Sequence, residues 1–319
     1  MTSKPAFLGE LAVFTGRANP RLAQAIAKHL DIDLSPLIVT SFPDQEIAVR
    51  IDVSVRGKDV FIIQPTSPPA HASLVELLII LDAIRRASPA RITAVIPYYG
   101  YARQDKKTAG REPITARLVA DMITSAGADR VLTVDLHSPQ IQGFFNIPVD
   151  QLTAVPVLSD YISSWHLADT VVVTPDAGRV NMATEYANRL GVPVVIIHKR
   201  RITGESTEVA HIVGDVRGKR PIIIDDMITT GGTIHRSVEA LITHGALPEV
   251  FIAASHGVLV GKALELLSNP AICQIAVTDS VLIEPVKQIE KLHTVSIASL
   301  LAGAITRIHD NSSVSEMFE

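Results

Sequence analysis

The chain has 319 residues, of which 47 % are hydrophobic and 4 % are aromatic. This length is about twice that of a typical domain, so we expect two domains with a substantial core. The formal net charge of −4 argues against a general nucleic-acid or membrane-surface binder. Neither an export signal nor an apolar run of membrane-spanning length is evident, so a soluble cytoplasmic protein is expected.

Short β-branched runs alternate with longer amphipathic stretches along the chain. Strands are predicted at Val60–Ile63, Ile92–Ile96, Val131–Val134, Val171–Val173, Val194–Ile197, Ile222–Ile224, Phe251–Ala253 and Ile275–Val277. Helices are predicted between them at Ala72–Ala87, Ala116–Ala126, Val180–Leu190 and Ile234–His244. This alternation is typical of an α/β protein with a mostly parallel, doubly wound sheet. Cys273 falls in a strand-like run, where we expect a core residue, and as the single cysteine it cannot form an internal disulfide.

The polar clusters begin where the predicted strands end. Open α/β sheets bind ligands at that edge, because loops gather there and helix N-termini direct their N–H groups toward it. Around Pro148–Pro156 the periodicity is lost, which indicates a joint between two halves. No sequence-level repeat relates the halves, so any internal duplication would be structural only.

The strongest local pattern runs from Arg220 to Leu241. A buried strand ends in two aspartates, and a threonine- and glycine-rich turn then opens a helix; the residues are Asp225, Asp226, Thr229, Thr230, Gly231, Gly232 and Thr233. Glycines allow successive N–H groups to converge on one anion, and paired carboxylates suit the vicinal hydroxyls of a ribose. An isolated Gly-Gly-Thr would more often be a plain strand-to-helix turn. The whole pattern resembles the ribose-phosphate loop of type I phosphoribosyltransferases, which leaves nucleobase transferases and the enzyme that makes their donor both open.

Other clusters carry suitable chemistry and also have plainer interpretations. Arg103 and Gln104 follow a predicted strand, where an arginine fork could bind polyphosphate or simply lie in a solvated basic loop. His137 and Asp176 each follow a strand, and a lone histidine there is more often structural than a ligand. Lys199 and Arg201 begin a polar stretch that could be a solvated loop or could stabilise a transferring phosphoryl group.

These clusters resemble ribose-phosphate pyrophosphokinases over essentially the whole chain. The matching segments are FPDQEIAVRI (42–51), RITAVIPYYGYARQDKK (91–107), TVDLHSPQIQGFF (133–145), TPDAG (174–178), HKRR (198–201), HIVGDV (211–216) and the turn described above. The resemblance implies two similar type I phosphoribosyltransferase-like domains, each a mostly parallel sheet flanked by helices. The first would comprise residues 1–152, with about 304–319 packing back on it, and the second, 153–303, would carry the ribose-5-phosphate loop.

The resemblance also implies an activity, transfer of the diphosphate of MgATP to ribose 5-phosphate, and a role for each matching residue. Lys199 and Arg201 would be catalytic. The expected ATP-binding residues are Phe42, Asp44, Gln45 and Glu46, contributed by a neighbouring subunit, together with Arg103 and Gln104. The expected ribose-5-phosphate ligands are Arg201, Asp225, Asp226, Thr229, Thr230, Gly231, Gly232 and Thr233. His137 and Asp176 would belong to a Mg²⁺ site, although imidazole is an unusual ligand for this cation.

Assembly and regulation are expected from the resemblance alone. A dimer would complete the ATP site, and three dimers would form a hexamer. Inorganic phosphate and ADP are the expected effectors, and the tail with Ser313 and Ser315 would help to form their site. No nucleic-acid or membrane partner is expected.

The chain departs from the family pattern at three positions. Thr229 stands where an aspartate is more typical, and Asn146 replaces a commonly acidic residue, which removes support for a secondary cation site. Arg179 replaces a second glycine, and two interpretations stay open: it reaches pyrophosphate, or it crowds the loop. The alternative functions are a nucleobase phosphoribosyltransferase, which would not require the ATP-side clusters, and a non-catalytic regulatory homologue, which should lack the loop cations or an ATP contact.

Overall fold

The computed structural model describes residues 9–165, 168–201 and 207–318; for 199–201 and 207–210 it describes the backbone alone. The chain divides into two compact units. The first contains Met1–Leu152, Ser280–Leu282 and Ser296–Glu319, and the second contains Thr153–Asp279 and Ile283–Val295. None of the helices in the described ranges has the length and apolar character needed to span a bilayer.

The first unit is built on a parallel sheet with the strand order β1-β4-β5-β6-β7. Its strands are β1 (Leu11–Thr15), β4 (Asp59–Ile63), β5 (Arg91–Ile96), β6 (Arg130–Val134) and β7 (Val149–Leu152). An antiparallel hairpin, β2 (Leu37–Ser41) and β3 (Ile47–Ile51), forms a separate two-stranded sheet. The helices are α1 (Pro20–His29), α2 (Ala70–Arg86), α3 (Thr115–Ala126) and α8 (Ala298–His309), with the 3₁₀ helices η1 (Pro139–Phe144) and η4 (Ser315–Phe318).

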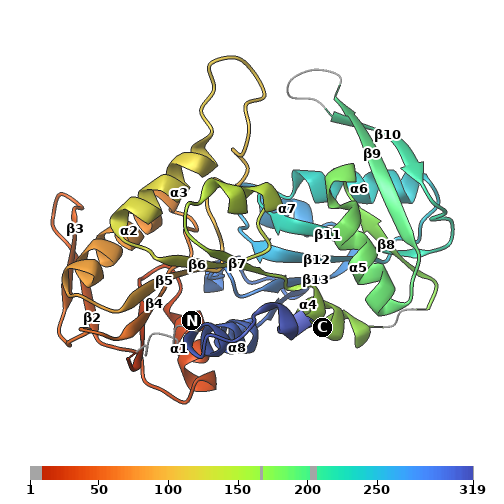
Figure 1. Cartoon of the computed structure of the whole chain (residues 1–319). Helices are drawn as coiled ribbons and strands as arrows, with labels where there is room; N and C mark the ends of the chain where they lie inside the picture. The colour runs from red at the N-terminus through yellow and green to blue at the C-terminus, as the bar shows by residue number, and fades with distance from the viewer. Residues whose placement is uncertain (1–8, 166–167, 202–206, 319) are drawn as a thin grey trace, which may run out of the picture. The chain divides into compact units, whose positions relative to one another are not determined.

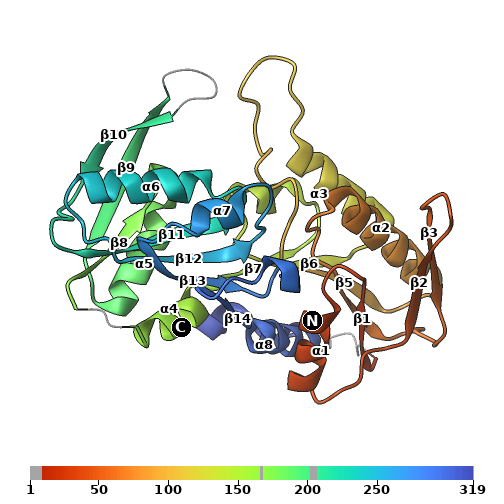
Figure 2. The same ribbon diagram turned by 180° about the vertical axis from the view of Figure 1, so that it is seen from behind.

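Helices cover both faces of this sheet. Figure 1 shows α2 and α3 on one face and α1 and α8 on the other, and Figure 2 shows the same layers from behind. Every residue of β4 is buried, as expected of a parallel strand covered on both sides. The side chain of Asn19 accepts a hydrogen bond from Leu22 N (3.2 Å), and Pro20 occupies the first turn; together they define where α1 begins.

A buried ion cluster joins the last helix to the first sheet. Asp59, which is 0 % exposed, accepts hydrogen bonds from Arg91 Nε (2.8 Å) and Nη2 (2.6 Å). The same Nη2 donates to the carbonyl of Ile308 (2.8 Å), and Nδ1 of His309 lies 2.9 Å from Asp59 Oδ2. Residues at the end of α8 therefore contact the amino ends of β4 and β5, far away in the sequence.

The second unit has the strand order β10-β9-β8-β11-β12-β13-β14. Its strands are β8 (Thr170–Thr174), β9 (Val194–Arg201), β10 (Thr207–Val213), β11 (Arg220–Ile228), β12 (Val250–Gly257), β13 (Ile272–Thr278) and β14 (Leu292–Val295). Neighbouring strands are parallel except β10, which is antiparallel to β9. The helices are α4 (Val155–Ser163), α5 (Val180–Leu190), α6 (Gly232–Thr243) and α7 (Ala263–Leu267), with the 3₁₀ helices η2 (Ala177–Arg179) and η3 (Pro285–Lys287).

The predicted α/β class with mostly parallel sheets is confirmed. The core assignment of Cys273 is wrong, because this thiol is exposed. Side chains alternate between the two faces of a strand, so Cys273 points away from the face on which Ile272 is buried. The domain limits predicted from the sequence stay a prediction, and the short segment Ser280–Leu282 of the first unit was not anticipated.

Candidate active site

The order of strands in the second unit contains a reversal between β8 and β11. From β8 the chain proceeds to β9 on one side, whereas from β11 it proceeds to β12 on the other. Such a reversal leaves a crevice at the carboxyl ends of the two central strands, the usual ligand position in open α/β sheets. Asp176 follows β8 at this edge, and the turn beginning at Thr229 follows β11.

The turn after β11 has the geometry of an anion cradle. Gly231 has φ +77°, a left-handed conformation that favours glycine, and α6 begins at the next residue. A Cβ on Gly231 would lie 3.3 Å from the Cα of Ala263, so the packing also leaves little room for a side chain. The first turn of a helix has N–H groups without partners inside the helix, and its dipole attracts negative charge. The predicted residues 229–233 thus form one short segment that can receive a phosphate.

Two buried carboxylates precede this turn. Asp225 is 9 % exposed and Asp226 is 2 % exposed, and Asp225 Oδ1 accepts a hydrogen bond from the backbone N–H of Asp226 (2.9 Å). Burial raises the pKa of Asp225 well above its ordinary value, and the neighbouring Asp226 raises it further. Arg179 opposes this shift, since its Nη2 lies 3.0 Å from Asp226 Oδ2 and its Nε lies 4.0 Å from Asp225 Oδ1.

Arg179 is therefore a site residue that the sequence did not assign. The interpretations left open were contact with pyrophosphate and crowding of the loop, whereas the structure pairs the guanidinium with the acidic pair. The sequence carried no signal for this contact, because it depends on the pairing of β8 with β11, two strands that are far apart in the sequence.

Asp176 is exposed at the end of β8 and organises its own loop. Its Oδ1 accepts a hydrogen bond from Gly178 N (2.8 Å), and its carbonyl accepts one from the hydroxyl of Thr174 (2.8 Å). The charge of Asp176 is among the causes of the raised pKa of Asp225, which places the two carboxylates near each other. The structure thus brings Asp176, Arg179, the acidic pair and the cradle together at one edge of the second sheet.

Lys199 and Arg201 occupy the end of β9. The strand runs beyond the predicted Val194–Ile197 to Arg201, and it pairs with β10 so that Lys199 lies opposite Val209 and Arg201 opposite Thr207. The described parts of the polar stretch, up to Arg201 and from Thr207, are therefore strands rather than loop. The side chains of Lys199 and Arg201, and residues 202–206 as a whole, lie outside the described part of the chain.

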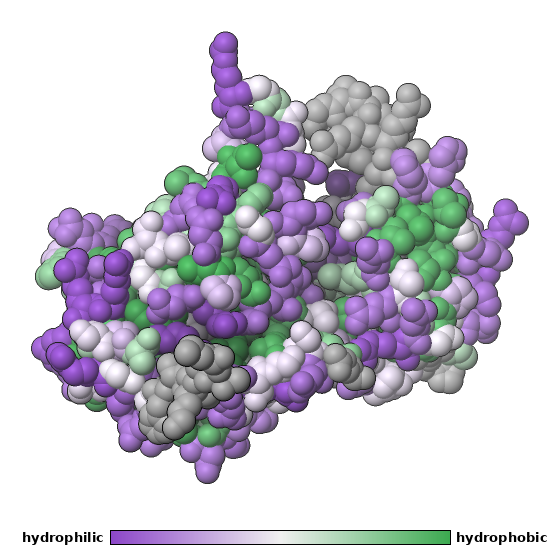
Figure 3. Space-filling view, viewed as in Figure 1, coloured by the Kyte–Doolittle hydropathy of each residue, from purple (hydrophilic) through white to green (hydrophobic). Residues whose placement is uncertain are grey.

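In the first unit, Arg103 and Gln104 follow β5 at the carboxyl edge of the sheet. Gln104 Oε1 accepts a hydrogen bond from the hydroxyl of Thr115 (2.6 Å), and the backbone carbonyl of Gln104 accepts one from Ala116 N (3.1 Å). Both contacts attach the loop to the start of α3. The amide hydrogens are then the groups that Gln104 can offer to a ligand. The surface of the loop that continues to α3 is largely hydrophilic (Figure 3), and most of its residues are exposed.

Contacts between the segments after β4 and β5 support the same edge of the sheet. Gly100 N donates to the hydroxyl of Thr66 (2.6 Å), and a Cβ on Gly100 would lie 2.5 Å from the Thr66 carbonyl oxygen, so only glycine fits here. Tyr101 has φ +65° and its hydroxyl hydrogen-bonds to His71 Nδ1. His137, half-buried, follows β6. Arg103, Gln104 and His137 thus belong to the carboxyl edge of one sheet.

Two predicted groups lie elsewhere in the first unit. Phe42, Asp44, Gln45 and Glu46 form the exposed tip of the β2–β3 hairpin, and the Phe42 side of this tip is closed by the hydrogen bond from its N–H to the Glu46 carbonyl (2.8 Å). Ser313 and Ser315 are exposed beyond α8. Arg307 holds that tail, because its Nη1 donates to the carbonyl of Ser313 (2.8 Å) and lies 2.9 Å from Glu316 Oε2.

The expected magnesium residues come from different units, so a shared site for His137 and Asp176 stays a prediction. Among the described residues, no group of three or more His, Cys, Asp or Glu side chains is arranged to hold a metal ion. Magnesium commonly keeps several waters and binds through one or two carboxylates plus substrate phosphates. The exposed carboxylate of Asp176 beside the acidic pair fits that mode of binding.

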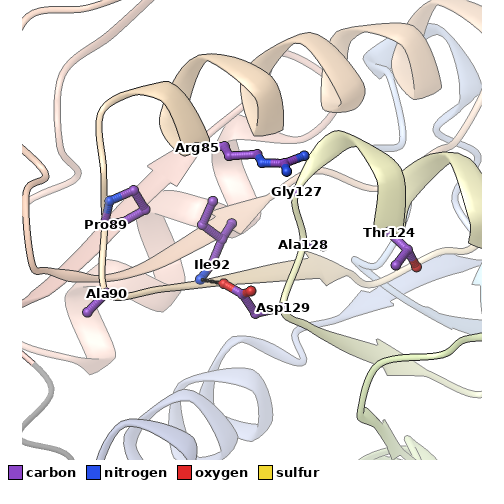
Figure 4. Close-up of a pocket in the computed structure, with 8 residues that line it drawn as sticks. All are labelled: Arg85, Pro89, Ala90, Ile92, Thr124, Gly127, Ala128 and Asp129. Carbon is purple, nitrogen blue, oxygen red and sulfur yellow. Dashed lines mark hydrogen bonds between the residues drawn. The ribbon is translucent and has the colours of Figure 1, made fainter.

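Two cavities bordered by described residues lie away from these groups. One, of about 310 Å³, is lined by residues that include Arg85, Ile92 and Asp129 (Figure 4). Asp129 Oδ2 accepts a hydrogen bond from Ile92 N (2.8 Å) there, at the start of β5 and therefore at the amino edge of the sheet. The other, of about 730 Å³, borders Asp215, Arg217 and His244 at the end of α6.

The fold and the candidate site define a class: an α/β protein whose polar residues gather at the switch point of a parallel sheet. Comparison with known proteins refines this class. The family model described as the N-terminal domain of ribose phosphate pyrophosphokinase matches residues 11–127, and the phosphoribosyl synthetase-associated domain matches residues 201–319. A relative from Caldanaerobacter subterraneus subsp. tengcongensis, described as ribose-phosphate pyrophosphokinase, is 51 % identical over 98 % of this chain and 99 % of its own length.

Further similarities agree with these. A protein of the same description from Gloeobacter violaceus is 48 % identical over 97 % of this chain and 93 % of its own. The crystal structure of phosphoribosylpyrophosphate synthetase from Mycobacterium smegmatis superposes with a TM-score of 0.90 at 47 % identity, covering 95 % of this chain and 100 % of that one. The chain belongs to the ribose-phosphate pyrophosphokinase family.

Proposed function

We propose that this chain is a ribose-phosphate diphosphokinase. It transfers the β,γ-diphosphoryl group of MgATP to the 1-hydroxyl of ribose 5-phosphate, and the products are 5-phospho-α-D-ribose 1-diphosphate and AMP. The carrying observation is 51 % identity over 98 % of the chain with a relative described as ribose-phosphate pyrophosphokinase. We place the reaction in the cytoplasm, where its product feeds nucleotide, histidine and tryptophan biosynthesis.

The sugar side of the reaction is assigned to the second unit. The N–H groups and hydroxyls of residues 229–233 would bind the 5-phosphate, because a helix N-terminus after a glycine turn favours an anion. Asp225 and Asp226 would accept hydrogen bonds from the ribose hydroxyls and orient the sugar. The anomeric hydroxyl then attacks the β-phosphorus in line, and AMP leaves. Thr229 supplies a hydroxyl rather than a carboxylate in this cradle.

Stabilisation of the transition state is assigned to Lys199 and Arg201. Diphosphoryl transfer spreads negative charge over the equatorial oxygens, so catalysis consists mainly of positioning and charge stabilisation. A loose transition state of this kind needs little help from a general base. Arg201 would also contact ribose 5-phosphate. Both residues end the strand next to β8, which supports their proximity to Asp176.

The nucleotide side is assigned to the first unit of one chain and the hairpin tip of another. Arg103 would bind the polyphosphate through its fork of donors, and Gln104 is held by Thr115 so that its amide hydrogens can donate. In a neighbouring subunit, Phe42, Asp44, Gln45 and Glu46 would hold the adenine, and the exposure of this tip supports a role in contact with another chain. We therefore propose a dimer-based homo-oligomer, three dimers forming a hexamer.

Magnesium enters with ATP and, when bound, offsets the phosphate charge. Asp176 and His137 are the residues that would hold it, and the carboxylate is the stronger candidate because hard cations prefer oxygen ligands. Inorganic phosphate and ADP are the proposed effectors. Their site would include Ser313 and Ser315, and the attachment of the tail to Arg307 supports a defined position for these hydroxyls.

The test incubates the purified chain with ribose 5-phosphate and MgATP in phosphate buffer. AMP and 5-phospho-α-D-ribose 1-diphosphate should form in equal amounts. Absence of AMP would refute catalysis and favour the non-catalytic homologue. Consumption of the diphosphate product with adenine or guanine, in place of its formation, would identify a nucleobase phosphoribosyltransferase.

A second experiment tests the assignment of the loop cations. Lys199→Ala should lower kcat by orders of magnitude with little change in ATP affinity, because the ammonium acts mainly on the transition state. Lys28→Ala is the matched control, since Lys28 is exposed in the last turn of α1 and away from every proposed site residue. If the kcat of Lys199→Ala equals that of the control, Lys199 has no part in the mechanism.

A further inference from the structure

Arg179 contacts the acidic pair of the candidate ribose site, although it is not one of the ligands expected from the sequence. It is the last residue of η2, and its side chain is 11 % exposed. The 3₁₀ turn directs the guanidinium from the end of β8 toward β11, where Nη2 lies 3.0 Å from Asp226 Oδ2 and Nε lies 4.0 Å from Asp225 Oδ1. One planar group thus contacts two consecutive carboxylates.

The turn that carries Arg179 is itself fixed. Asp176 Oδ1 accepts a hydrogen bond from Gly178 N (2.8 Å), and the carbonyl of Asp176 accepts one from the N–H of Arg179 (3.4 Å). A guanidinium on a fixed backbone, with most of its surface buried, has few alternative rotamers to occupy. Arg179 can therefore hold a partner in one orientation, which a flexible surface arginine could not do.

The acidic pair needs such a partner. Asp226 is almost fully buried, and an ionised carboxylate removed from water is unfavourable unless a cation and hydrogen bonds compensate it. Asp225 lies beside it, and the electrostatic repulsion between the two, together with burial, raises the pKa of Asp225. Of the two contacts of Arg179 with the acidic pair, the one with Asp226 is the shorter, so the guanidinium mainly holds the Asp226 carboxyl group.

We propose that Arg179 is a positioning residue for ribose 5-phosphate: it holds the Asp226 carboxylate, through Oδ2, in the orientation that accepts the ribose hydroxyls. Arg179 acts through Asp226 and not by contact with the sugar or the phosphates. The inference rests on the proposed function only in naming ribose 5-phosphate as the ligand.

The proposal predicts a selective effect on the sugar substrate. Arg179→Met preserves much of the side-chain volume and removes the charge, and it should raise KM for ribose 5-phosphate about tenfold or more, the range of coupling between contacting residues. The KM for ATP should change much less. Arg179→Lys should lie between wild type and Arg179→Met, because an ammonium can keep one contact but not a planar fork. Arg189→Met is the control, since Arg189 forms only an exposed pair with Glu185 in α5.

A double-mutant cycle separates positioning from direct contact. In the Asp226→Asn background, Arg179→Met should have little further effect on KM for ribose 5-phosphate, because the carboxylate through which Arg179 acts is gone. Additive effects of the two substitutions would overturn the proposal and indicate that Arg179 contacts substrate itself. Equal losses for ribose 5-phosphate and ATP, accompanied by a lower Tm, would also overturn it and leave a structural role only.

Calorimetric titration of ribose 5-phosphate into the protein without ATP gives a readout independent of turnover. Arg179→Met should weaken this binding by the same factor as it raises KM, and wild-type affinity in the variant would refute the proposal. If wild type binds ribose 5-phosphate but forms no AMP, the proposed function fails while the inference about Arg179 is still tested. If Arg179→Met does not fold, the Arg179→Lys variant is compared with wild type in the same way, by its KM and binding affinity for ribose 5-phosphate and its KM for ATP.

Discussion

The substitution Arg91→Met tests how strongly the last helix is tied to the first sheet. Arg91 makes two hydrogen bonds to the fully buried carboxylate of Asp59, at 2.8 and 2.6 Å, and a third to the carbonyl of Ile308 at 2.8 Å. Methionine can occupy much of the same volume but offers no donor. In the variant, Asp59 keeps His309 Nδ1, 2.9 Å away, as its remaining contact within this cluster.

The structure sets the expected magnitude. The Arg91 side chain is 15 % exposed and the Asp59 side chain 0 %, so solvent screening of the pair is weak. Removing one partner from a buried ion pair destabilises a protein by about 3–5 kcal/mol, because the other charge stays buried without compensation. For a unit of this size, each kcal/mol lowers Tm by about 2–4 °C, so a fall of roughly 6–20 °C is expected.

Urea unfolding followed by far-UV circular dichroism measures the loss of unfolding free energy in Arg91→Met. Hydrogen exchange shows which elements lose protection. Exchange should accelerate in α8 and at the amino ends of β4 and β5. Arg86→Met is the matched control, because Arg86 forms only an exposed pair with Asp82, four residues before it in α2. If both variants lose the same stability, or if exchange in α8 is unchanged by Arg91→Met, the cluster does not hold the helix as argued.

The remaining predictions concern the ribose site. Burial raises the pKa of Asp225, so the folded protein keeps a proton on this carboxyl group at pH values where the unfolded chain has released it. The contribution of Asp225 to stability therefore falls as the pH rises from its ordinary pKa through its raised pKa in the folded state. Asp225→Asn should therefore raise Tm at neutral pH, reduce the fall in stability with pH and lower turnover. Thermal denaturation at acidic and at neutral pH measures the change in Tm, and a lower Tm of the variant at neutral pH would contradict the prediction. Gly231→Ala should cost about 1–2 kcal/mol, because φ is +77°, and should weaken ribose 5-phosphate binding in calorimetry; unchanged stability and affinity would show that the cradle tolerates a Cβ.

The inner strands of the two large sheets could be predicted from the sequence because most of them are nearly fully buried, whereas the edge strands β1, β7, β10 and β14 were not predicted. Strand β8 and the Ile222–Ile224 part of β11 are apolar on both faces, so their β-branched runs appear directly in the sequence. The β2–β3 hairpin was not predicted either, although β2 contains the β-branched run Ile38–Thr40; its strands are only partly buried, which makes the pattern less clear. The length of β9 was underestimated for a related reason: its last residues are polar and continue the strand through pairing with β10.

The site was predictable as a set of chemical groups but not as a set of contacts. Asp225, Asp226 and the glycine turn stand together in the sequence, so their grouping follows from the strand that carries them. Arg179, which contacts Asp226, follows a different strand. Whether its guanidinium contacts a phosphate, solvent or a carboxylate depends on the direction of one side chain, which the sequence does not specify. The attachment of Gln104 to Thr115 depends in the same way on how the loop after β5 returns to α3.

The position of α8 has a consequence for the order in which the protein is made. Its buried residues Leu301, Ile305 and Ile308 complete the first unit, yet they are translated after nearly the whole of the second. At about 5–20 residues per second, the ribosome needs roughly 7–30 s to pass from Leu152 to α8. During that interval the surface of α1 that α8 will cover, and the carboxylate of Asp59, have no partner from the C-terminal segment. During the same interval the nascent first unit lacks a helix of its core, so it is exposed to aggregation until the end of the chain has been made.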